Sequence, residues 1–364
     1  MDIYDAVVIG AGQAGLAASY ELRRRGVNFV VLDRNDSPGG AWQHRWDSLT
    51  MKDVHGIANL PSTDPPAQSS SKANTVIPEY FGKFEADQQL PIERPVRVTE
   101  VVPARGSVKT DPDAPLLVKG ITSDGERTWL TRAIVNATGT WGRPFIPYYP
   151  GAESFQCRQF HTVSYPGPEY FRGKRTLVVG GGASAVQFLG EIGPLTDTLW
   201  VTRREPQWAT EAFDGLGVVT RVEERVVHGL PPKSVSAETG ITLRAQEQEA
   251  KRLGVYDRWR LIFDRIEPEG VSWDNGDFEP FDVILWATGF RPDIKHLSPL
   301  GLLSKHGGVA LQRVKNNVQG ATTSVRDPRA HFVGYGPSAS TVGALRAART
   351  AAKAVAQRAR YQAR

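Results

Sequence analysis

The sequence predicts an α/β protein in which one supersecondary unit occurs twice. The chain opens with the apolar run Ile3 to Ile9, a glycine-rich turn, a helical stretch from Gln13 to Arg25 and a second apolar run from Val27 to Leu32. The same order of strand, glycine-rich turn, helix and strand returns between Thr176 and Thr202. Each segment has the order of a parallel crossover unit, so we expect two Rossmann-like dinucleotide-binding domains.

The later part of the chain predicts that the second domain is inserted in the first. Two apolar strands end in near-identical signatures, Ala137-Thr138-Gly139 and Ala287-Thr288-Gly289. The segment His331 to Gly336 indicates a strand and turn that lead into an Ala- and Arg-rich final helix. We expect this segment to complete the first domain, which gives residues 1–150 and 287–364 for the first domain and 151–286 for the inserted one.

Two other stretches have local signals. Leu116 to Ile121 and Arg127 to Leu130 flank the sequence Ser-Asp-Gly-Glu, a pattern that predicts a β-hairpin. Pro61 to Pro78 is rich in Ser, Pro, Ala and Thr, which favours a loop over the surface or over a cleft.

Composition excludes several classes of protein. With 364 residues, 40% hydrophobic and 23% charged, the chain suits a two-domain soluble globular protein. No stretch approaches the roughly 18 apolar residues of a membrane helix, and no secretion signal precedes Ile3, so we expect a cytoplasmic protein without membrane insertion. Cys157 is the only cysteine and the seven histidines show no ligand spacing, so we expect no disulfide and no metal. The basic excess of the last helix, Arg346 to Arg364, favours a solvated face over nucleic-acid binding.

The first glycine-rich turn, Gly10-Ala11-Gly12-Gln13-Ala14-Gly15, lies between strand and helix. Its first glycine permits a tight turn, its second lets a pyrophosphate approach the backbone, and its third lets the helix pack on the strand. This pattern alone is a weak signal. Here Asp33 follows at the end of the second strand, where a carboxylate accepts hydrogen bonds from ribose hydroxyls, so we expect dinucleotide binding.

The second turn, Gly180-Gly181-Gly182-Ala183-Ser184-Ala185, is followed by a strand that ends in Arg203 and Arg204 instead of an acid. Two guanidinium groups at that place suit a 2′-phosphate, so NADPH is favoured while NADH stays possible. Solvated surface arginines are the alternative interpretation. Two cofactors on one chain indicate hydride transfer between a nicotinamide and a flavin, but the spacing does not say which turn holds the flavin.

The chain resembles the class B flavoprotein monooxygenases, the group of flavin-containing monooxygenases and Baeyer–Villiger enzymes. It is most similar to a short bacterial branch described as flavoproteins associated with cation-diffusion transporters. The resemblance covers nearly the whole chain, including the first turn, Gly39-Gly40-Ala41-Trp42, Trp46-Asp47-Ser48-Leu49, both Ala-Thr-Gly strands, the second turn and Phe332-Val-Gly-Tyr-Gly336. It implies a glutathione-reductase-type fold with FAD at the first turn and the nicotinamide cofactor at the second.

The identifying sequence of that group corresponds to Phe155-Gln-Cys157-Arg-Gln-Phe-His161-Thr-Val-Ser-Tyr165-Pro166. Cys157 stands where the group has glycine, which removes the freedom to adopt positive φ there. In the group, the histidine is thought to couple domain movement with catalysis. The alternative is a structural histidine in the interdomain linker.

The resemblance also implies the site residues. Lys52 and Asp53, in the loop that related enzymes place over the flavin, and His161 are the catalytic candidates, although a solvated loop charge is the alternative for the first two. The expected FAD contacts are Gly10, Gly12, Gln13, Gly15, Asp33, Arg34, Gly40, Trp42, Val98, Thr138, Gly139, Gly334 and Thr341. The expected NADPH contacts are Gly180, Gly182, Ser184, Gln187, Arg203 and Arg204.

The leading hypothesis is an NADPH-consuming FAD monooxygenase. Oxygen would add at flavin C4a to give a (hydro)peroxyflavin that oxygenates a small sulfide, amine or ketone, with the protein excluding water. The first alternative is a reductase that passes electrons to a quinone or protein acceptor; a dithiol mechanism needs more than one cysteine. The second is a non-catalytic flavoprotein that senses redox state or partners a transporter. We expect a small-molecule substrate and O2 as partners, no nucleic acid, and a monomer or homodimer.

Overall fold

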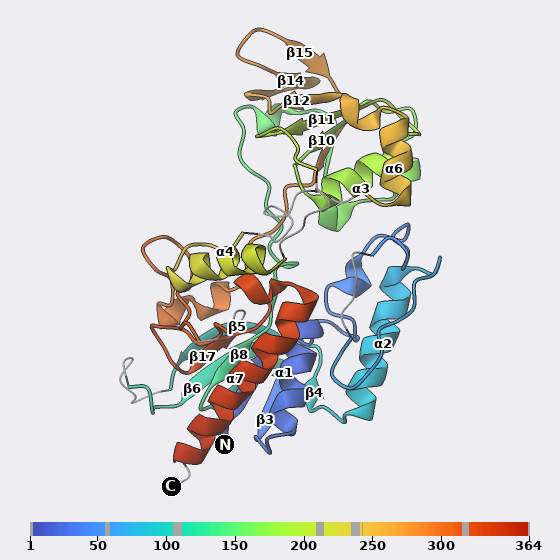
Figure 1. The fold of residues 1–364 in the computed structure, drawn as a ribbon. Coiled ribbons are helices and arrows are strands. Elements are labelled where there is room, and N and C mark those ends of the chain that lie inside the picture. The colour runs from blue at the N-terminus through green and yellow to red at the C-terminus, as the bar shows by residue number, and fades with distance from the viewer. Residues whose placement is uncertain are drawn as a thin grey trace.

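The computed structural model describes residues 3–54, 59–104, 111–208, 215–233, 241, 243–314 and 320–362. The chain forms two α/β units, a larger one that contains both described ends and a smaller central one (Figure 1). This is the predicted fold class. None of the described helices is long and apolar enough to cross a membrane. Within the same ranges, no three His, Cys, Asp or Glu side chains gather as a possible metal site.

The larger unit is built on a parallel five-stranded sheet. Its strands lie in the order β17-β8-β2-β3-β4 and are β2 (Ala6–Ile9), β3 (Phe29–Leu32), β4 (Ile92–Glu93), β8 (Ile134–Asn136) and β17 (Ala330–Phe332). Helices α1 (Gln13–Arg23) and α7 (Thr341–Gln362) pack side by side on one face (Figure 1). The final strand and helix therefore complete the first unit, as the inserted-domain prediction requires.

A second sheet covers the other face of this unit. It has the order β1-β7-β6-β5 and consists of β1 (Ile3–Tyr4), β5 (Arg97–Pro103), β6 (Leu116–Thr122) and β7 (Gly125–Thr131). β6 and β7 pair antiparallel, which confirms the predicted hairpin. Val7, Ile9 and Phe332 from the parallel sheet share one buried cluster with Val118 and Trp129 from the hairpin.

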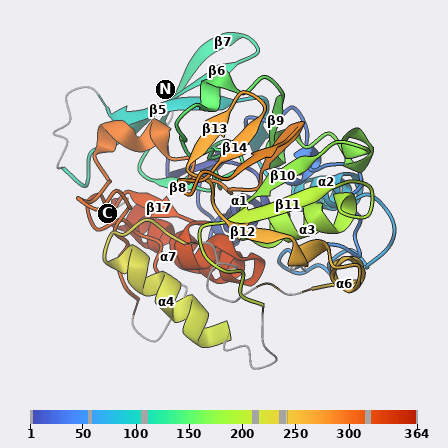
Figure 2. The same ribbon diagram turned by 90° about the horizontal axis from the view of Figure 1, so that it is seen from above.

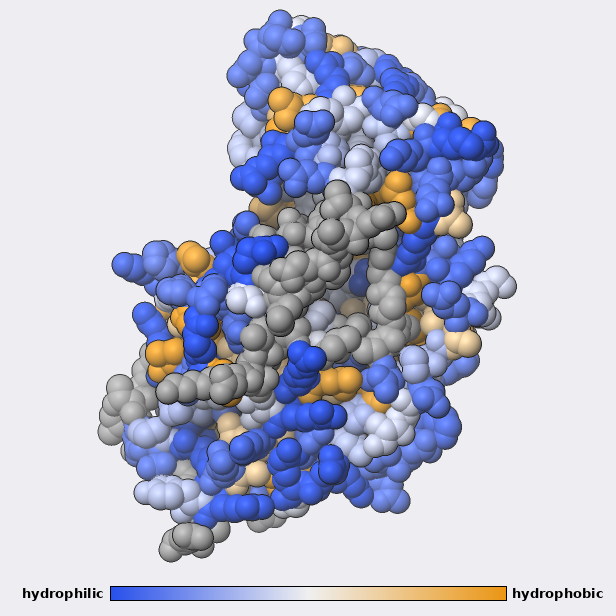
Figure 3. Space-filling view, viewed as in Figure 1, coloured by the Kyte–Doolittle hydropathy of each residue, from blue (hydrophilic) through white to orange (hydrophobic). Residues whose placement is uncertain are grey.

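The central unit repeats this plan. Its parallel sheet has the order β12-β11-β10-β16-β9 and consists of β9 (Arg158–His161), β10 (Thr176–Val179), β11 (Thr198–Thr202), β12 (Trp259–Leu261) and β16 (Val283–Trp286). Helices α3 (Ala183–Ile192) and α6 (Ala245–Arg252) cover one face. The small antiparallel sheet of β13 (Arg265–Glu267), β14 (Gly270–Ser272) and β15 (Phe278–Pro280) lies on the other side (Figure 2). The face of this unit that Figure 3 shows is mostly hydrophilic.

Helix α4 (Gly215–Val227) departs from the predicted domain boundaries. It lies in the range 151–286 but packs on the larger unit (Figure 1). Val226 belongs to the buried cluster of Leu311 and Tyr335, and Glu224 pairs with Arg313 at 2.6 Å. The boundaries as a whole stay a prediction, and the sequence did not indicate this return of the chain to the larger unit.

Helix α2 (Ala73–Asp87) corrects the expectation of a loop from Pro61 to Pro78, because its first turns lie inside that stretch. Ala73, Ile77, Phe81 and Phe84 are fully or almost fully buried and recur at helical spacing. Pro78 lies within the helix, where a proline ring normally disfavours continuation. The buried face therefore outweighs the proline and the loop-like composition.

Candidate functional site

The two glycine-rich turns are built alike. Gly10 and Gly180 both have positive φ, +101° and +138°. A Cβ on Gly10 would lie 2.7 Å from the Ala137 carbonyl oxygen, and a Cβ on Gly180 would lie 2.2 Å from that of Ala287. Only glycine fits either place. Each turn therefore packs against the alanine of one Ala-Thr-Gly segment, which explains why both patterns occur twice in the sequence.

The second glycine of each turn faces open space. A Cβ added to Gly12 or Gly182 would meet no heavy atom within 4 Å, and these glycines are the N-caps of α1 and α3 without a side-chain cap. The N-terminus of each helix, with the positive end of its dipole, therefore lies at the second glycine, where a bound anion is stabilised. Both turns fit the pyrophosphate of a dinucleotide. Ser184 and Gln13 follow directly in the first turns of these helices.

Asp33 lies at the end of β3 inside a network that the sequence did not reveal. Its carboxylate is 3% exposed and accepts hydrogen bonds from Arg94 Nε at 3.0 Å and Asn35 Nδ2 at 3.4 Å. Arg94 also donates two hydrogen bonds to Glu85, at 2.7 and 2.6 Å. The parallel pairing of β3 with β4 brings Arg94 beside Asp33. The carboxylate is therefore held in a fixed orientation at the end of the strand, where the sequence predicted a ribose contact.

Arg203 and Arg204 follow β11 as predicted. Both side chains are exposed and neither forms a hydrogen bond or ion pair with any other residue that the structure describes. The strand end itself is fixed, because Trp259 Nε1 donates to Thr202 Oγ1 at 2.7 Å and the Thr202 hydroxyl donates to the Arg204 carbonyl. Two exposed guanidinium groups therefore follow a strand end that these hydrogen bonds fix.

The first Ala-Thr-Gly segment contacts Asp293, four residues beyond the second segment, where the units join. Thr138 Oγ1 donates to the Asp293 carbonyl at 2.6 Å, and the Asp293 N–H donates to the Gly139 carbonyl at 3.0 Å. Arg34 Nη1 reaches the Asp293 carboxylate at 3.1 Å. Arg34, Thr138 and Gly139, all expected near FAD, thus converge on one residue just beyond the second segment.

His161 ends β9 at the same junction. Its Nε2 lies 3.0 Å from the Gly289 carbonyl oxygen, its Nδ1 accepts the Val163 N–H at 3.4 Å, and its ring contacts Phe290 edge-on. Burial lowers its pKa, so the ring is neutral with Nε2 as the donor. These contacts favour a role in holding the linker, and a catalytic role stays a prediction.

Cys157 takes an ordinary backbone conformation. The non-glycine residues with positive φ in the described ranges are Ser62 and Gln89. The substitution of the usual glycine therefore introduces no backbone strain at this position. The side chain is exposed.

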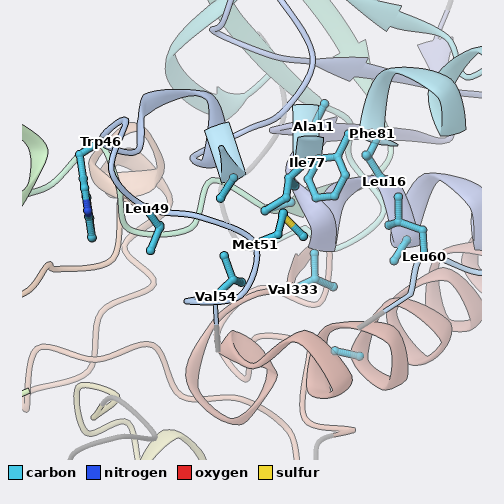
Figure 4. Packing of buried hydrophobic residues seen from close by; sticks show 14 of the residues in the cluster. Ala11, Leu16, Trp46, Leu49, Met51, Val54, Leu60, Ile77, Phe81 and Val333 are labelled. Atoms are coloured by element: carbon cyan, nitrogen blue, oxygen red, sulfur yellow. The ribbon is translucent and has the colours of Figure 1, made fainter. Parts of the chain in front are cut away.

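The loop from Gly39 to Val54 closes over the first turn. A Cβ on Gly40 would lie 2.8 Å from Gly12 Cα, so the loop backbone passes directly above the turn. Trp42 begins a 3-10 turn, η1 (Trp42–His44). Buried side chains anchor the loop beside α2 and Val333 (Figure 4). The labelled residues that belong to the loop are Leu49, Met51 and Val54, with Trp46 at the edge of the group.

The catalytic candidates in this loop differ in their surroundings. Lys52 is exposed. Asp53 is half-buried, its carboxylate accepts the Thr50 hydroxyl, and its carbonyl accepts Gln187 Nε2 at 3.2 Å. Gln187, expected to contact NADPH, therefore joins α3 to the loop. None of these contacts assigns a catalytic role.

Arg45 is a residue of this loop that the sequence did not single out. Its guanidinium carbon lies 4.4 Å from the ring centre of Trp141, with Trp42 and Trp46 at 5.3 and 6.0 Å. Its Nε is buried without a hydrogen-bond partner in the described structure, and burial lowers its pKa to about 10. A desolvated cation with a free donor suits an anionic or carbonyl group of a bound molecule.

Glu191 is a second residue that the sequence did not identify. It lies on α3 and accepts hydrogen bonds from Trp46 Nε1 at 3.2 Å, Ser48 Oγ at 2.8 Å and Tyr165 Oη at 2.9 Å. Burial raises its pKa, and burial likewise raises the pKa of Tyr165. The carboxylate thus joins the central unit to the loop that covers the first turn.

The remaining predicted contacts lie around the first turn. A Cβ on Gly334 would lie 3.3 Å from Ala14 Cβ, and the Val333 N–H donates to the Asn136 carbonyl at 3.0 Å. Val98 packs on the buried cluster that contains Ile9 and Leu32. Thr341 begins α7, and its side chain lies outside the described part. All these positions stay predicted contacts.

Comparison with known proteins supplies the family. The family model of the pyridine nucleotide-disulphide oxidoreductases matches residues 4–325. A flavin-containing monooxygenase from Stenotrophomonas maltophilia is similar in structure, with a TM-score of 0.80 and 34% identity over 99% of both chains. An oxidoreductase named CzcO from Bacillus velezensis is 25% identical over 87% of this chain and 90% of its own length. A Baeyer-Villiger monooxygenase from Streptomyces coelicolor is 27% identical over 67% of this chain and 46% of its own length.

These matches agree with the resemblance drawn from the motifs. The family model spans both glycine-rich turns, and the Stenotrophomonas protein matches the chain from end to end. The chain therefore belongs to the pyridine nucleotide-disulphide oxidoreductase family and, within it, to the flavin monooxygenases, and it is a flavin-dependent oxidoreductase.

Proposed function

We propose that this protein is an NADPH-dependent FAD monooxygenase that oxygenates a small sulfide, amine or ketone. The observation that carries the proposal is the pair of matched turns. Each has an open second glycine at an uncapped helix N-terminus, and a loop from the first unit reaches the helix of the second. One dinucleotide at each turn would place two redox cofactors on opposite sides of the unit junction.

The surroundings of the two turns support the choice of cofactor. The Gly39 to Val54 loop passes over Gly12, and Asp33 is buried in an ion network, which suits a cofactor that stays bound. In the second turn Gly181 is exposed, and so are the arginines beyond β11. These features suit a nicotinamide dinucleotide with a 2′-phosphate that exchanges in every turnover.

A flavin bound at the first turn would supply the redox chemistry, in which NADPH, a proton and O2 give NADP+, oxygenated substrate and water. The chain contributes binding, orientation and exclusion of water. Leu49, Met51 and Val54 are buried and hold the loop on the hydrophobic core (Figure 4). Arg45 offers a desolvated donor beside three tryptophan rings.

The test is anaerobic reduction of the FAD-loaded protein by NADPH, followed by admission of O2 under stopped-flow absorbance between about 350 and 500 nm. We expect a long-lived species that absorbs in the near ultraviolet before oxidised flavin returns, and oxygenated product from a panel of sulfides, amines and ketones. Direct return of oxidised flavin, with hydrogen peroxide equal to the NADPH consumed and no product, would overturn the proposal. Rapid electron transfer to an added quinone would then support the reductase.

A further inference from the structure

Glu191 contacts the Gly39 to Val54 loop through its carboxylate, and packing alone would not require a charged group there. Glu191 is half-buried, so its carboxylate loses part of its hydration, and an apolar side chain of similar volume would fill the same space at lower cost. Here the cost is offset by three donors, and they come from separate parts of the chain. Trp46 and Ser48 belong to the loop, and Tyr165 belongs to the segment that enters the central unit.

The whole contact lies on one face of α3. Gln187 and Glu191 are one helical turn apart, and Phe188 lies beside them. Gln187 donates to the Asp53 carbonyl at 3.2 Å, while the Phe188 ring lies 4.3 Å from Tyr165 and 4.9 Å from Trp46. The helix is thus fastened to both ends of the loop segment between residues 46 and 53.

Both partners of this contact are tied to a dinucleotide turn. α3 begins just after Gly182, about 14 Å from Glu191 along the helix axis at about 1.5 Å per residue. The loop begins at Gly39, and the next residue, Gly40, lies over Gly12. Since a helix is rigid over this length, a shift at Glu191 moves the open end of α3 relative to the first turn.

We propose that Glu191 is a positioning residue for hydride transfer, which sets the placement of the nicotinamide-binding helix relative to the flavin by holding Trp46 and Ser48. This inference rests on the proposed function, because it takes NADPH to bind at α3 and FAD at the first turn. Reaction rates between bound groups are sensitive to displacements of about 1 Å, which can cost on the order of 100-fold. Binding of each cofactor alone is far less sensitive to such a shift.

The decisive variant is Glu191→Gln. The amide keeps the volume of the carboxylate but has only one acceptor oxygen and no charge. With that oxygen toward Trp46, the Ser48 and Tyr165 hydroxyls must turn to accept from the amide N–H groups, so the charged three-donor contact is replaced by weaker neutral hydrogen bonds. We expect the rate of flavin reduction by NADPH to fall about 10- to 100-fold. The NADPH dissociation constant should stay within about threefold, and the FAD content and the rate of reduction by dithionite should stay unchanged, because neither depends on the placement of α3.

Matched variants separate positioning from folding. Ser48→Ala removes one donor from the loop side and should slow flavin reduction in the same way, while Ser48→Thr keeps a hydroxyl and should restore it. In Ser48→Ala combined with Glu191→Gln the two effects should not add, because both act on one hydrogen bond. Glu249→Gln, an exposed glutamate paired with Arg252 on the neighbouring helix α6, serves as the control and should behave like the wild type.

Three outcomes would overturn the inference. One is wild-type reduction rates in both Glu191→Gln and Ser48→Ala. Another is a slower rate that is accompanied by equal loss of FAD or of NADPH affinity, which would indicate a structural role. The third is a wild-type protein that neither NADPH nor NADH reduces, which would remove the proposed function as well. Should Glu191→Gln fail to retain FAD, the comparison of Ser48→Ala with Ser48→Thr decides alone.

Discussion

The two dinucleotide turns share one backbone plan but have different surroundings. In the first, a Cβ on Gly15 would lie 1.9 Å from the Gly10 carbonyl oxygen, so helix and turn are in direct contact. The second turn has Ala185 at this position, fully buried without conflict. In the first turn Ala11 is buried, a loop passes over Gly12, and the next strand ends in a buried, paired acid. In the second turn Gly181 is exposed, and the next strand ends in two exposed arginines. The same strand-turn-helix-strand arrangement thus forms a covered dinucleotide site, called the closed site, and a more exposed one, called the open site.

This difference has a physical consequence for exchange. Affinity differences between related sites arise mostly in dissociation rates, and a covered site with desolvated partners releases its ligand slowly. We therefore expect the first turn to retain its dinucleotide through purification and the second to release it. Substitutions in and around the two turns test this difference, beginning with the largest effect.

The largest effect is expected at the third position of the turns. Gly15→Ala places a methyl group against the Gly10 carbonyl in the core, so we expect loss of FAD and of most soluble protein. Ala185→Gly only loosens α3 by about 1 kcal/mol and should retain FAD. FAD content after purification and thermal unfolding of both variants measure this. Equal FAD content in the two variants would show that the turns are packed alike.

The second prediction replaces the second glycine of each turn by alanine. Because nothing lies within 4 Å of a Cβ at Gly12 or Gly182, Ala at either place should leave the fold intact and obstruct only a bound pyrophosphate. We expect Gly12→Ala to lose FAD affinity by about 100-fold or more, and Gly182→Ala to keep FAD but lose NADPH affinity to a similar degree. Titration of both variants with each cofactor assigns the turns. The opposite pattern would reverse the assignment.

Several parts of the fold and site were within reach of the sequence. The strands β10 and β11 and the helix α1 fall within two residues of their predicted bounds, because their apolar periodicity and glycine-rich turns are local signals. The first glycines and the Ala-Thr-Gly segments were each recognised. The sequence did not predict that each first glycine packs against an Ala-Thr-Gly segment, because this contact depends on the parallel pairing of strands far apart in the chain.

Glu191 and Arg94, which sequence reasoning missed, each interact with a residue far away along the chain. Glu191 and Ser48 are 143 residues apart, and Arg94 and Asp33 are 61 apart, so no local pattern links them. α2 was missed for a different reason. The composition around Pro78 favoured a loop, while the burial of Ile77 and Phe81, which decides the helix, depends on tertiary packing.

The third prediction removes the cation of the closed site. Arg94→Met leaves Asp33 and Glu85 buried without their partner, so we expect a loss of about 3 kcal/mol in the free energy of unfolding and weaker FAD binding. Arg127→Met is the control, because its pair with Glu93 is half-exposed and contributes little. Urea unfolding with and without added FAD measures both. Similar losses of unfolding free energy in the two variants would show that the ion pairs of Arg94 contribute no more to stability than the half-exposed pair of Arg127.

The fourth prediction concerns pH and the larger unit. His296 is buried beside Asn136 at 2.8 Å, and burial lowers its pKa to about 4. In the unfolded chain the His296 imidazole is protonated near pH 6.5, whereas in the folded protein it stays neutral down to about pH 4. The free energy of unfolding is therefore highest above pH 6.5 and falls as the pH decreases toward 4. At pH 5 the loss amounts to roughly 2 kcal/mol. In His296→Gln the unfolding free energy should fall less steeply between pH 6.5 and 5; an identical slope would contradict this assignment.

The smallest effect is expected at the open site, where it discriminates between cofactors. In Arg203→Ser combined with Arg204→Ser, the 2′-phosphate loses its charge-assisted donors, so the NADPH Michaelis constant should rise about 10-fold. NADH lacks this phosphate, so its Michaelis constant should stay within about twofold. FAD content should be unchanged, because the closed site lies in the other unit. Steady-state oxidation of both cofactors measures the ratio. If the variant keeps the wild-type preference, the two arginines are solvated surface charges, and the open site selects its cofactor by other contacts.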